Sequence, residues 1–238
     1  MSSPFDQAHD FKLAPYLPMF DPDHFHDQAF FLELERIGYR QVLLGGTGTA
    51  NLPELVSAIK RATRLQVVLY PGGPGALADA DLVVLPDVMN SNSHYARPFG
   101  SGSVATAMNV LQRGLKFLPV AYFIMGNSTA AWFYDSFRLP SEKVLLGYAG
   151  YARMVGYRYL ALDYEDPSLD IRPELITALR RIPDMRLVIS DEFTPQRARQ
   201  ARSLGADTLI TPSDLYEEAS DPLALAARFY DDVLSLDV

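Results

Sequence analysis

The sequence predicts an α/β protein, a single-domain (β/α)8 TIM barrel, and two observations carry this prediction. Short apolar runs rich in Val, Leu, Ile and Tyr recur along the 238 residues without polar alternation, which is typical of parallel strands buried on both faces. Amphipathic stretches separate these runs. Eight such units in a chain of this length fit a barrel, whereas a doubly wound sheet of about five or six strands would leave units over.

The predicted strands follow one another along most of the chain. They are Tyr16–Phe20, Gln41–Gly45, Leu65–Tyr70, Asp81–Leu85, Pro119–Met125, Tyr157–Asp163, Arg186–Ile189 and Asp207–Ile210. No low-complexity segment or linker interrupts this series. We therefore expect one barrel domain at residues 15–238, preceded by an N-terminal extension at residues 1–14.

Helices are predicted between the strands from apolar spacing and capping residues. Apolar side chains recur at helical spacing over residues 30–37 and 52–59, which indicates one buried face on each helix. Further on, Thr194 precedes Pro195. An N-cap residue followed by proline at the first helical position predicts a helix from there to Ser203.

Composition excludes several classes of function. The chain has 29 acidic and 21 basic residues, a net charge of −8 and no cysteine. The acidic balance disfavours a nucleic-acid partner, and the absence of cysteine excludes disulfides, thiolate nucleophiles and iron–sulfur ligation. The first ten residues lack the basic and apolar regions of a signal peptide. The longest apolar runs reach about half of the roughly 20 residues that a membrane span needs, so we expect a cytoplasmic protein.

A barrel carries its functional side chains in the loops that follow its strands. In this sequence those loops are rich in carboxylates, glycine and small hydroxyl residues. Six strings cover strand ends and the start of the loops that follow: FDPDHF (20–25), LLGGTGT (43–49), VVLYPG (67–72), DLVVLPDVMNS (81–91), LALDYED (160–166) and DTLITPSDLYEE (207–218).

In this order, these strings resemble the geranylgeranylglyceryl phosphate synthases of archaea and their bacterial heptaprenylglyceryl phosphate synthase relatives. The resemblance covers the chain from about residue 16 to 220. It implies a TIM barrel that uses Mg²⁺ and alkylates glycerol 1-phosphate with a long allylic isoprenoid diphosphate. The predicted domain is then a TIM-barrel prenyltransferase-like domain.

The resemblance assigns the diphosphate side of the site residue by residue. The family's metal-binding aspartate falls on Asp21, and the hydroxyl residue after its glycine pair falls on Thr47. Both are oxygen ligands that suit Mg²⁺, although Asp21 could instead be a turn residue before the following proline. Gly46, Asn90 and Ser91 are the candidate diphosphate-binding residues.

Aromatic residues are candidates for the wall of a prenyl channel, because an allylic carbocation is stabilised by aromatic faces. Tyr70 and Tyr122 lie on or at the end of predicted strands, and Tyr95 follows the DLVVLPDVMNS string. The alternative for each is ordinary packing in the core.

The acceptor side departs from the family. Met19 stands where the family has a lysine, and Glu165, Asp191 and Ser213 fall in loops where it has phosphate-binding Ser-Gly, Gly-Gly and Gly-Asn pairs. Phosphate favours backbone N–H groups and cations, whereas carboxylates repel it. The sequence therefore predicts an acceptor other than glycerol 1-phosphate.

Two residues at the end of one predicted strand are the catalytic candidates, Asp163 and the adjacent Tyr164. One alignment places Asp163 on the family's catalytic glutamate and Ala161 on its tyrosine. A second alignment keeps the tyrosine at Tyr159 and loses the acid. We prefer the first, because it puts the carboxylate at a strand end. Asp163 is then either a general base or a rim carboxylate bound to Arg158 or to a loop amide.

Together these features predict a Mg²⁺-dependent prenyltransferase-like enzyme. Its donor would be an isoprenoid diphosphate of C10–C20 or longer, and its acceptor is unidentified. Two alternatives stay open. One is a terpene synthase, a lyase that releases diphosphate and yields a terpene alcohol or hydrocarbon, and the other is an isoprenoid-binding barrel without turnover. Relatives are often homodimers, and the sequence does not decide this.

Overall fold

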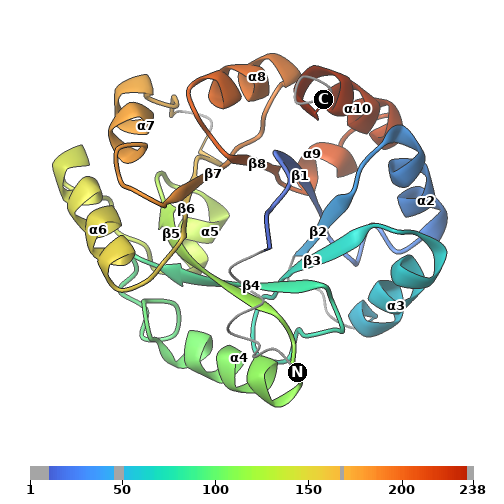
Figure 1. The fold of residues 1–238 in the computed structure, drawn as a ribbon, viewed down its shortest axis with the longest axis horizontal. Helices are drawn as coiled ribbons and strands as arrows, with labels where there is room; N and C mark the ends of the chain where they lie inside the picture. The colour runs from blue at the N-terminus through green and yellow to red at the C-terminus, as the bar shows by residue number, and fades with distance from the viewer. Residues whose placement is uncertain (1–10, 46–50, 167–168, 235–238) are drawn as a thin grey trace. The chain divides into compact units, whose positions relative to one another are not determined.

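The computed structural model describes residues 11–45, 51–166 and 169–234. The strands within them are β1 (Tyr16–Phe20), β2 (Gln41–Gly45), β3 (Gln66–Tyr70), β4 (Leu82–Val88), β5 (Phe117–Ile124), β6 (Tyr159–Asp163), β7 (Arg186–Ser190) and β8 (Thr208–Thr211). They form a closed barrel in chain order, and helices alternate with most of them (Figure 1). The predicted (β/α)8 TIM barrel is confirmed.

The helices are the second half of this alternation. They are α2 (Gln28–Ile37), α3 (Leu52–Ala62), α4 (Ser101–Gln112), α5 (Thr129–Phe133), α6 (Glu142–Met154), α7 (Pro173–Leu179), α8 (Pro195–Ser203), α9 (Asp214–Glu217) and α10 (Pro222–Phe229), followed by the π-helical turn η1 (Tyr230–Leu234). None of the described helices is long and apolar enough to cross a membrane.

One connection departs from the alternation. Residues 71–81 join β3 to β4 without forming a helix. They begin with the sequence Pro-Gly-Gly-Pro-Gly. Proline lacks the backbone N–H that a helix needs and glycine loses the most backbone entropy on ordering, so this segment disfavours a helix from its first turn.

The predicted helix signals are borne out by the caps. Asp27 accepts a hydrogen bond from the backbone of α2, and α3 carries a proline in its first turn. Thr194 caps α8 by accepting from the N–H of Arg197 at 3.2 Å. Asp27 and Thr194 each satisfy a donor that would otherwise have no partner at a helix start, and the proline of α3 has no N–H to satisfy there.

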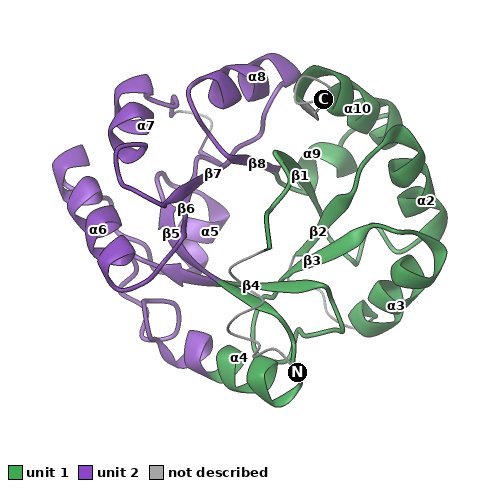
Figure 2. Cartoon of the chain, viewed as in Figure 1, with its two compact units in different colours: residues 1–85, 105–118, 211–238 green, residues 86–104, 119–210 purple. Residues whose placement is uncertain are grey.

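The chain divides into two compact units (Figure 2). Residues 1–85, 105–118 and 211–238 form the first, and residues 86–104 and 119–210 form the second. The first unit has an aromatic core in which the rings of Tyr16 and Phe229 stack with centroids 4.9 Å apart. In the second, β5, β6 and β7 pair in parallel over five residues at the β5–β6 and β6–β7 contacts.

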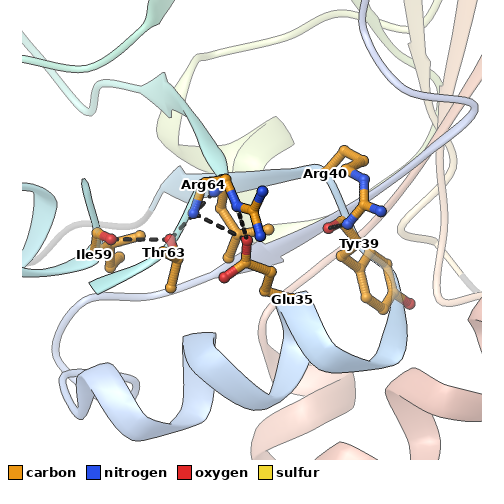
Figure 3. A network of polar contacts seen from close by, with 7 residues as sticks. Glu35, Tyr39, Arg40, Ile59, Thr63 and Arg64 are labelled. Carbon is orange, nitrogen blue, oxygen red and sulfur yellow. Dashed lines mark hydrogen bonds and ion pairs between the residues drawn. The ribbon is translucent and has the colours of Figure 1, made fainter. Parts of the chain in front are cut away.

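Polar contacts in the first unit join the end of α2 to the residues that lead from α3 into β3 (Figure 3). Glu35, near the end of α2, accepts a hydrogen bond from the backbone N–H of Arg64 at 3.1 Å and lies 3.5 Å from its Nε. Thr63, which caps α3, donates its hydroxyl to the Ile59 carbonyl at 2.9 Å. These contacts lie at the strand ends opposite to the functional loops, where barrel residues serve stability.

The start of the described chain is attached to the same unit. Gln41, at the first position of β2, accepts a hydrogen bond from the N–H of Ala14 at 2.7 Å and donates to the carbonyl of Lys12 at 2.9 Å. Leu13 between them is buried. The domain start at residue 15 stays a prediction.

Candidate active site

In the second unit, a tyrosine and an aspartate meet at the carboxyl ends of β5 and β6. Tyr122 pairs in register with Ala161, and Ile124 pairs with Asp163. Side chains two residues apart on a strand share a face, so Tyr122, Ala161 and Asp163 lie on one face of the sheet. The Tyr122 hydroxyl donates a hydrogen bond to Oδ2 of Asp163.

Asp163 is a buried carboxylate that two groups hold. Asp163 is only 1% exposed. Besides the Tyr122 hydroxyl at Oδ2, the backbone N–H of Glu165 donates to Oδ1 at 3.0 Å. Burial raises the pKa of the Asp163 carboxyl, and these two hydrogen bonds lower it in part. The result is a fixed carboxylate that binds a proton more readily than one in water.

A second buried carboxylate follows β7. Asp191 is 2% exposed, and its Oδ2 lies 2.8 Å from Nη2 of Arg197. Burial raises the pKa of Asp191 to about 6, against the opposing effect of the Arg197 guanidinium, and the charges of Glu192 and Asp163 add to the rise. Asp191 and Arg197 therefore form an ion pair at the carboxyl end of β7.

The remaining loop residues after β6 make contacts of their own. Tyr164 is 3% exposed, and burial together with the charge of Glu142 raises its pKa to about 12. Asp166 accepts a hydrogen bond from the N–H of Asn127 at 2.9 Å. Its side chain packs over Gly126, where a Cβ would come within 2.3 Å of the Asp166 Cβ.

The two residues predicted to bind diphosphate after β4 are engaged with the backbone. Asn90 donates from Nδ2 to the carbonyls of Ile124 and Phe137 at 2.8 and 2.9 Å, and its Oδ1 accepts from the N–H of Ile124 at 3.1 Å. The Ser91 hydroxyl donates to the carbonyl of Tyr134 at 2.5 Å. These contacts fix the loop after β4 against β5, and diphosphate binding by Asn90 and Ser91 stays a prediction.

In the first unit, the loops after β1 and β8 meet. Ser213 is buried, and its hydroxyl accepts a hydrogen bond from the N–H of Asp21 at 2.8 Å. The Asp21 carboxylate accepts from the N–H of Asp23 at 2.9 Å through Oδ1. Met19 lies against Gly45, where a Cβ would come within 2.9 Å of the Met19 sulfur.

The other predicted site residues are the two that follow Gly45 and two of the tyrosines proposed for the prenyl channel. Gly46 and Thr47 lie outside the described residues. Tyr70 lines a small hollow in the first unit together with Gly45. Tyr95 is 40% exposed, and its ring packs against Gly102 at the start of α4, where a Cβ would come within 2.6 Å of the ring. The channel roles of Tyr70, Tyr95 and Tyr122 stay predictions.

Sequence reasoning missed Arg197, the cation beside Asp191. The available signal was its position, because it lies in the first turn of the helix that follows β7. It also missed the contact between Tyr122 and Asp163, which follows from the register of β5 and β6. Among the described residues, no group of three histidine, aspartate or glutamate side chains is arranged to hold a metal ion.

Comparison with known proteins identifies the family of this chain and several relatives. Residues 9–229 match the model of the PcrB family. The chain belongs to the PcrB family. Among the relatives of this PcrB-family chain, the geranylgeranylglyceryl phosphate synthase of Cenarchaeum symbiosum is 31% identical over 185 residues, 74% of each chain. That of Nitrosopumilus maritimus is 30% identical over 190 residues, 75% of this chain and 74% of the relative.

Solved structures agree with the fold of this PcrB-family barrel. The (S)-3-O-geranylgeranylglyceryl phosphate synthase of Thermoplasma acidophilum, in complex with sn-glycerol-1-phosphate, superposes with a TM-score of 0.81 at 20% identity, covering 98% of this chain and 99% of the other. The corresponding synthase of Thermoplasma volcanium gives 0.79 at 20% identity, covering 93% of each chain.

These findings confirm two predictions for the PcrB-family chain and correct a third. The resemblance to the geranylgeranylglyceryl phosphate synthases is confirmed, and so is the prediction of a prenyltransferase. The prediction of an acceptor other than glycerol 1-phosphate is wrong. The relatives are synthases of a glyceryl phosphate, and the Thermoplasma acidophilum structure contains sn-glycerol-1-phosphate.

The physical reason for the error lies in the carboxylates after β6 and β7. The prediction treated them as unpaired charges that face an anion. In the structure, Asp191 is paired with Arg197, and Asp166 accepts a backbone hydrogen bond from Asn127. A paired carboxylate repels a phosphate far less than an isolated one, so counting acidic residues overstated the repulsion.

Proposed function

We propose that this protein transfers a prenyl group from an isoprenoid diphosphate to glycerol 1-phosphate. The observation that carries the proposal is the buried, doubly hydrogen-bonded carboxylate of Asp163 at the end of β6, in a barrel of the PcrB family. Relatives about 30% identical over three quarters of the chain carry the name of this synthase.

The transfer requires one proton acceptor. A hydroxyl oxygen of glycerol 1-phosphate forms a bond to C1 of the allylic group as the bond from C1 to the diphosphate oxygen breaks. The hydroxyl proton must then leave, and Asp163 is the proposed base that receives it. A base works best with a pKa near the operating pH, and burial moves Asp163 in that direction.

The acceptor's phosphate needs positive charge or N–H donors. Barrels commonly bind phosphate in the loops after their seventh and eighth strands. Arg197 follows β7, and its side chain is 36% exposed. We assign to Arg197 the attraction of the acceptor's phosphate, which would share the guanidinium with Asp191.

Diphosphate departure calls for a divalent cation, and Asp21 fits one. Mg²⁺ binds through one or two carboxylates together with waters and substrate phosphates, so a large acidic cluster is not required. Asp21 directly follows β1, is partly exposed, and has its carboxylate oriented by the N–H of Asp23. Thr47 is the second proposed ligand. When bound, Mg²⁺ would neutralise the diphosphate leaving group.

Other features of the proposal concern the donor and the assembly. A donor of C10–C20 or longer, a homodimer and a cytoplasmic location stay predictions. Of the aromatic candidates for the channel, Tyr70 lies beside the proposed metal loop, because it shares a hollow with Pro22 and Gly45.

The test is a direct assay of the purified protein. It is incubated with geranylgeranyl diphosphate, Mg²⁺ and glycerol 1-phosphate, and the ether product is measured by mass spectrometry. We expect product only when all three are present, and none with Asp163→Asn. Glycerol without phosphate serves as the matched acceptor control. Release of diphosphate at the same rate with and without the acceptor would contradict the proposal.

A further inference from the structure

We propose that Tyr122 is a positioning residue that holds the Asp163 carboxylate for proton transfer, rather than a wall of the prenyl channel. The inference rests on the proposed function, because it assigns Tyr122 a task in that reaction. Three observations support it: the register of β5 and β6, the hydrogen bond between the two side chains, and the small residue opposite Tyr122.

The register brings the hydroxyl to the carboxylate. Tyr122 lies directly opposite Ala161, and Asp163 lies two residues further along β6 on the same face. Diagonal neighbours of this kind are within reach of a long aromatic side chain. The methyl group of Ala161 leaves room for the Tyr122 ring to extend toward the strand end, where its hydroxyl meets Oδ2 of Asp163.

Burial shields the hydrogen bond between Tyr122 and Asp163 from water. Tyr122 is 8% exposed and Asp163 is 1% exposed, so neither group exchanges its partner freely with water. The hydrogen bond fixes one oxygen, and the N–H of Glu165 fixes the other. A carboxylate held at both oxygens keeps one orientation, which is what a base aimed at a bound hydroxyl needs.

Burial is what opposes the ionisation of Asp163. Asp191 carries a like charge, and Arg197 balances it in part. The charge of Asp163 raises the pKa of Tyr134, so that phenol stays neutral, and Glu165 provides a backbone donor to Asp163. Against this burial, the Tyr122 hydroxyl lowers the pKa of Asp163. Loss of the hydroxyl would raise that pKa and reduce the fraction of ionised base at a given pH.

A channel role and a positioning role make different demands on Tyr122. A channel wall needs the aromatic ring, and a positioning residue needs the hydroxyl. Tyr122→Phe keeps the ring and removes the hydroxyl, so it separates the two. The second unit also offers a matched control, because the Tyr157 hydroxyl donates in the same way to Asp87, a buried carboxylate that is not in the proposed machinery.

The experiment compares the wild type, Tyr122→Phe and Tyr157→Phe in the full chain. We expect Tyr122→Phe to lower kcat by about 10- to 100-fold with KM for the diphosphate unchanged. The acid limb of the kcat–pH profile should move upward by about one pH unit. Tyr157→Phe should leave the profile in place. An unchanged kcat and profile in Tyr122→Phe would overturn the inference.

A readout without turnover keeps the inference separate from the proposed function. Carboxyl ¹³C labelling of aspartate allows the Asp163 signal to be assigned by its loss in Asp163→Asn and followed through a pH titration by NMR. Tyr122→Phe should raise the titration midpoint of this signal, and Tyr157→Phe should not. An unmoved midpoint overturns the inference. A raised midpoint in a protein that makes no ether product overturns the proposed function and not the contact.

Discussion

Arg197 and Asp191 form an ion pair in which Nη2 and Oδ2 lie 2.8 Å apart, and the two partners differ sharply in exposure. The arginine side chain is 36% exposed and the aspartate side chain 2%. Removing one partner from such a pair has unequal effects, because the arginine can be hydrated and the aspartate cannot.

The first prediction concerns stability and pH. Burial raises the pKa of Asp191 to about 6 in the folded protein, above the ordinary value of an aspartate. A raised pKa means that this group contributes stability at low pH, which is lost as the pH rises through about 6. Asp191→Asn should therefore raise the Tm relative to the wild type at pH 8, and this gain should vanish at pH 4. Thermal unfolding at both values measures it, and a gain that is equal at both would contradict it.

The second prediction concerns the acceptor. Arg197→Ala should raise KM for glycerol 1-phosphate by about 10-fold, the loss of one charge-assisted contact, and leave KM for the diphosphate unchanged. Arg199→Ala, an exposed arginine on the same helix, is the control for a general loss of positive charge. Initial rates at varied acceptor concentration decide the matter, and equal effects of the two variants would rule out a specific role for Arg197.

The third prediction concerns the metal. Asp21→Asn should raise the Mg²⁺ concentration that gives half-maximal rate by about 10-fold or more. Asp23→Asn changes an exposed carboxylate in the same loop and should have little effect. Initial rates across a magnesium titration provide the comparison. If the two variants require the same magnesium concentration, Asp21 is not the ligand.

The fourth prediction concerns packing beneath Asp166. A Cβ at Gly126 would come within 2.3 Å of the Asp166 Cβ and 2.6 Å of its Oδ2, whereas nothing lies within 4 Å of a Cβ at Gly147 in α6. Gly126→Ala should destabilise the protein by about 1–3 kcal/mol. Gly147→Ala should stabilise it by about 0.5–1 kcal/mol. Urea unfolding of both variants tests the pair, and the same sign for both would contradict it.

Much of the fold could be predicted because buried parallel strands have a dense apolar signal. Strand β6, for example, is predicted as Tyr157–Asp163 and begins two residues later in the structure. The contacts in the site were harder to predict than the fold. The sequence places Asp163 and Asp191 at strand ends but does not say which side chain contacts them. Strand register and side-chain conformation determine that Tyr122 contacts Asp163 and that Arg197 contacts Asp191, and apolar periodicity does not encode either.

The side chain of Gln41 has a practical consequence for anyone who shortens this protein. It is 7% exposed. It accepts from the N–H of Ala14 and donates to the carbonyl of Lys12, and it also donates to Oε1 of Gln66 at 2.9 Å. A chain trimmed to begin at residue 15 would remove two of these partners and leave a buried amide poorly satisfied, at a cost of about 1–3 kcal/mol. Affinity tags and fusions at this end are therefore best joined upstream of residue 11.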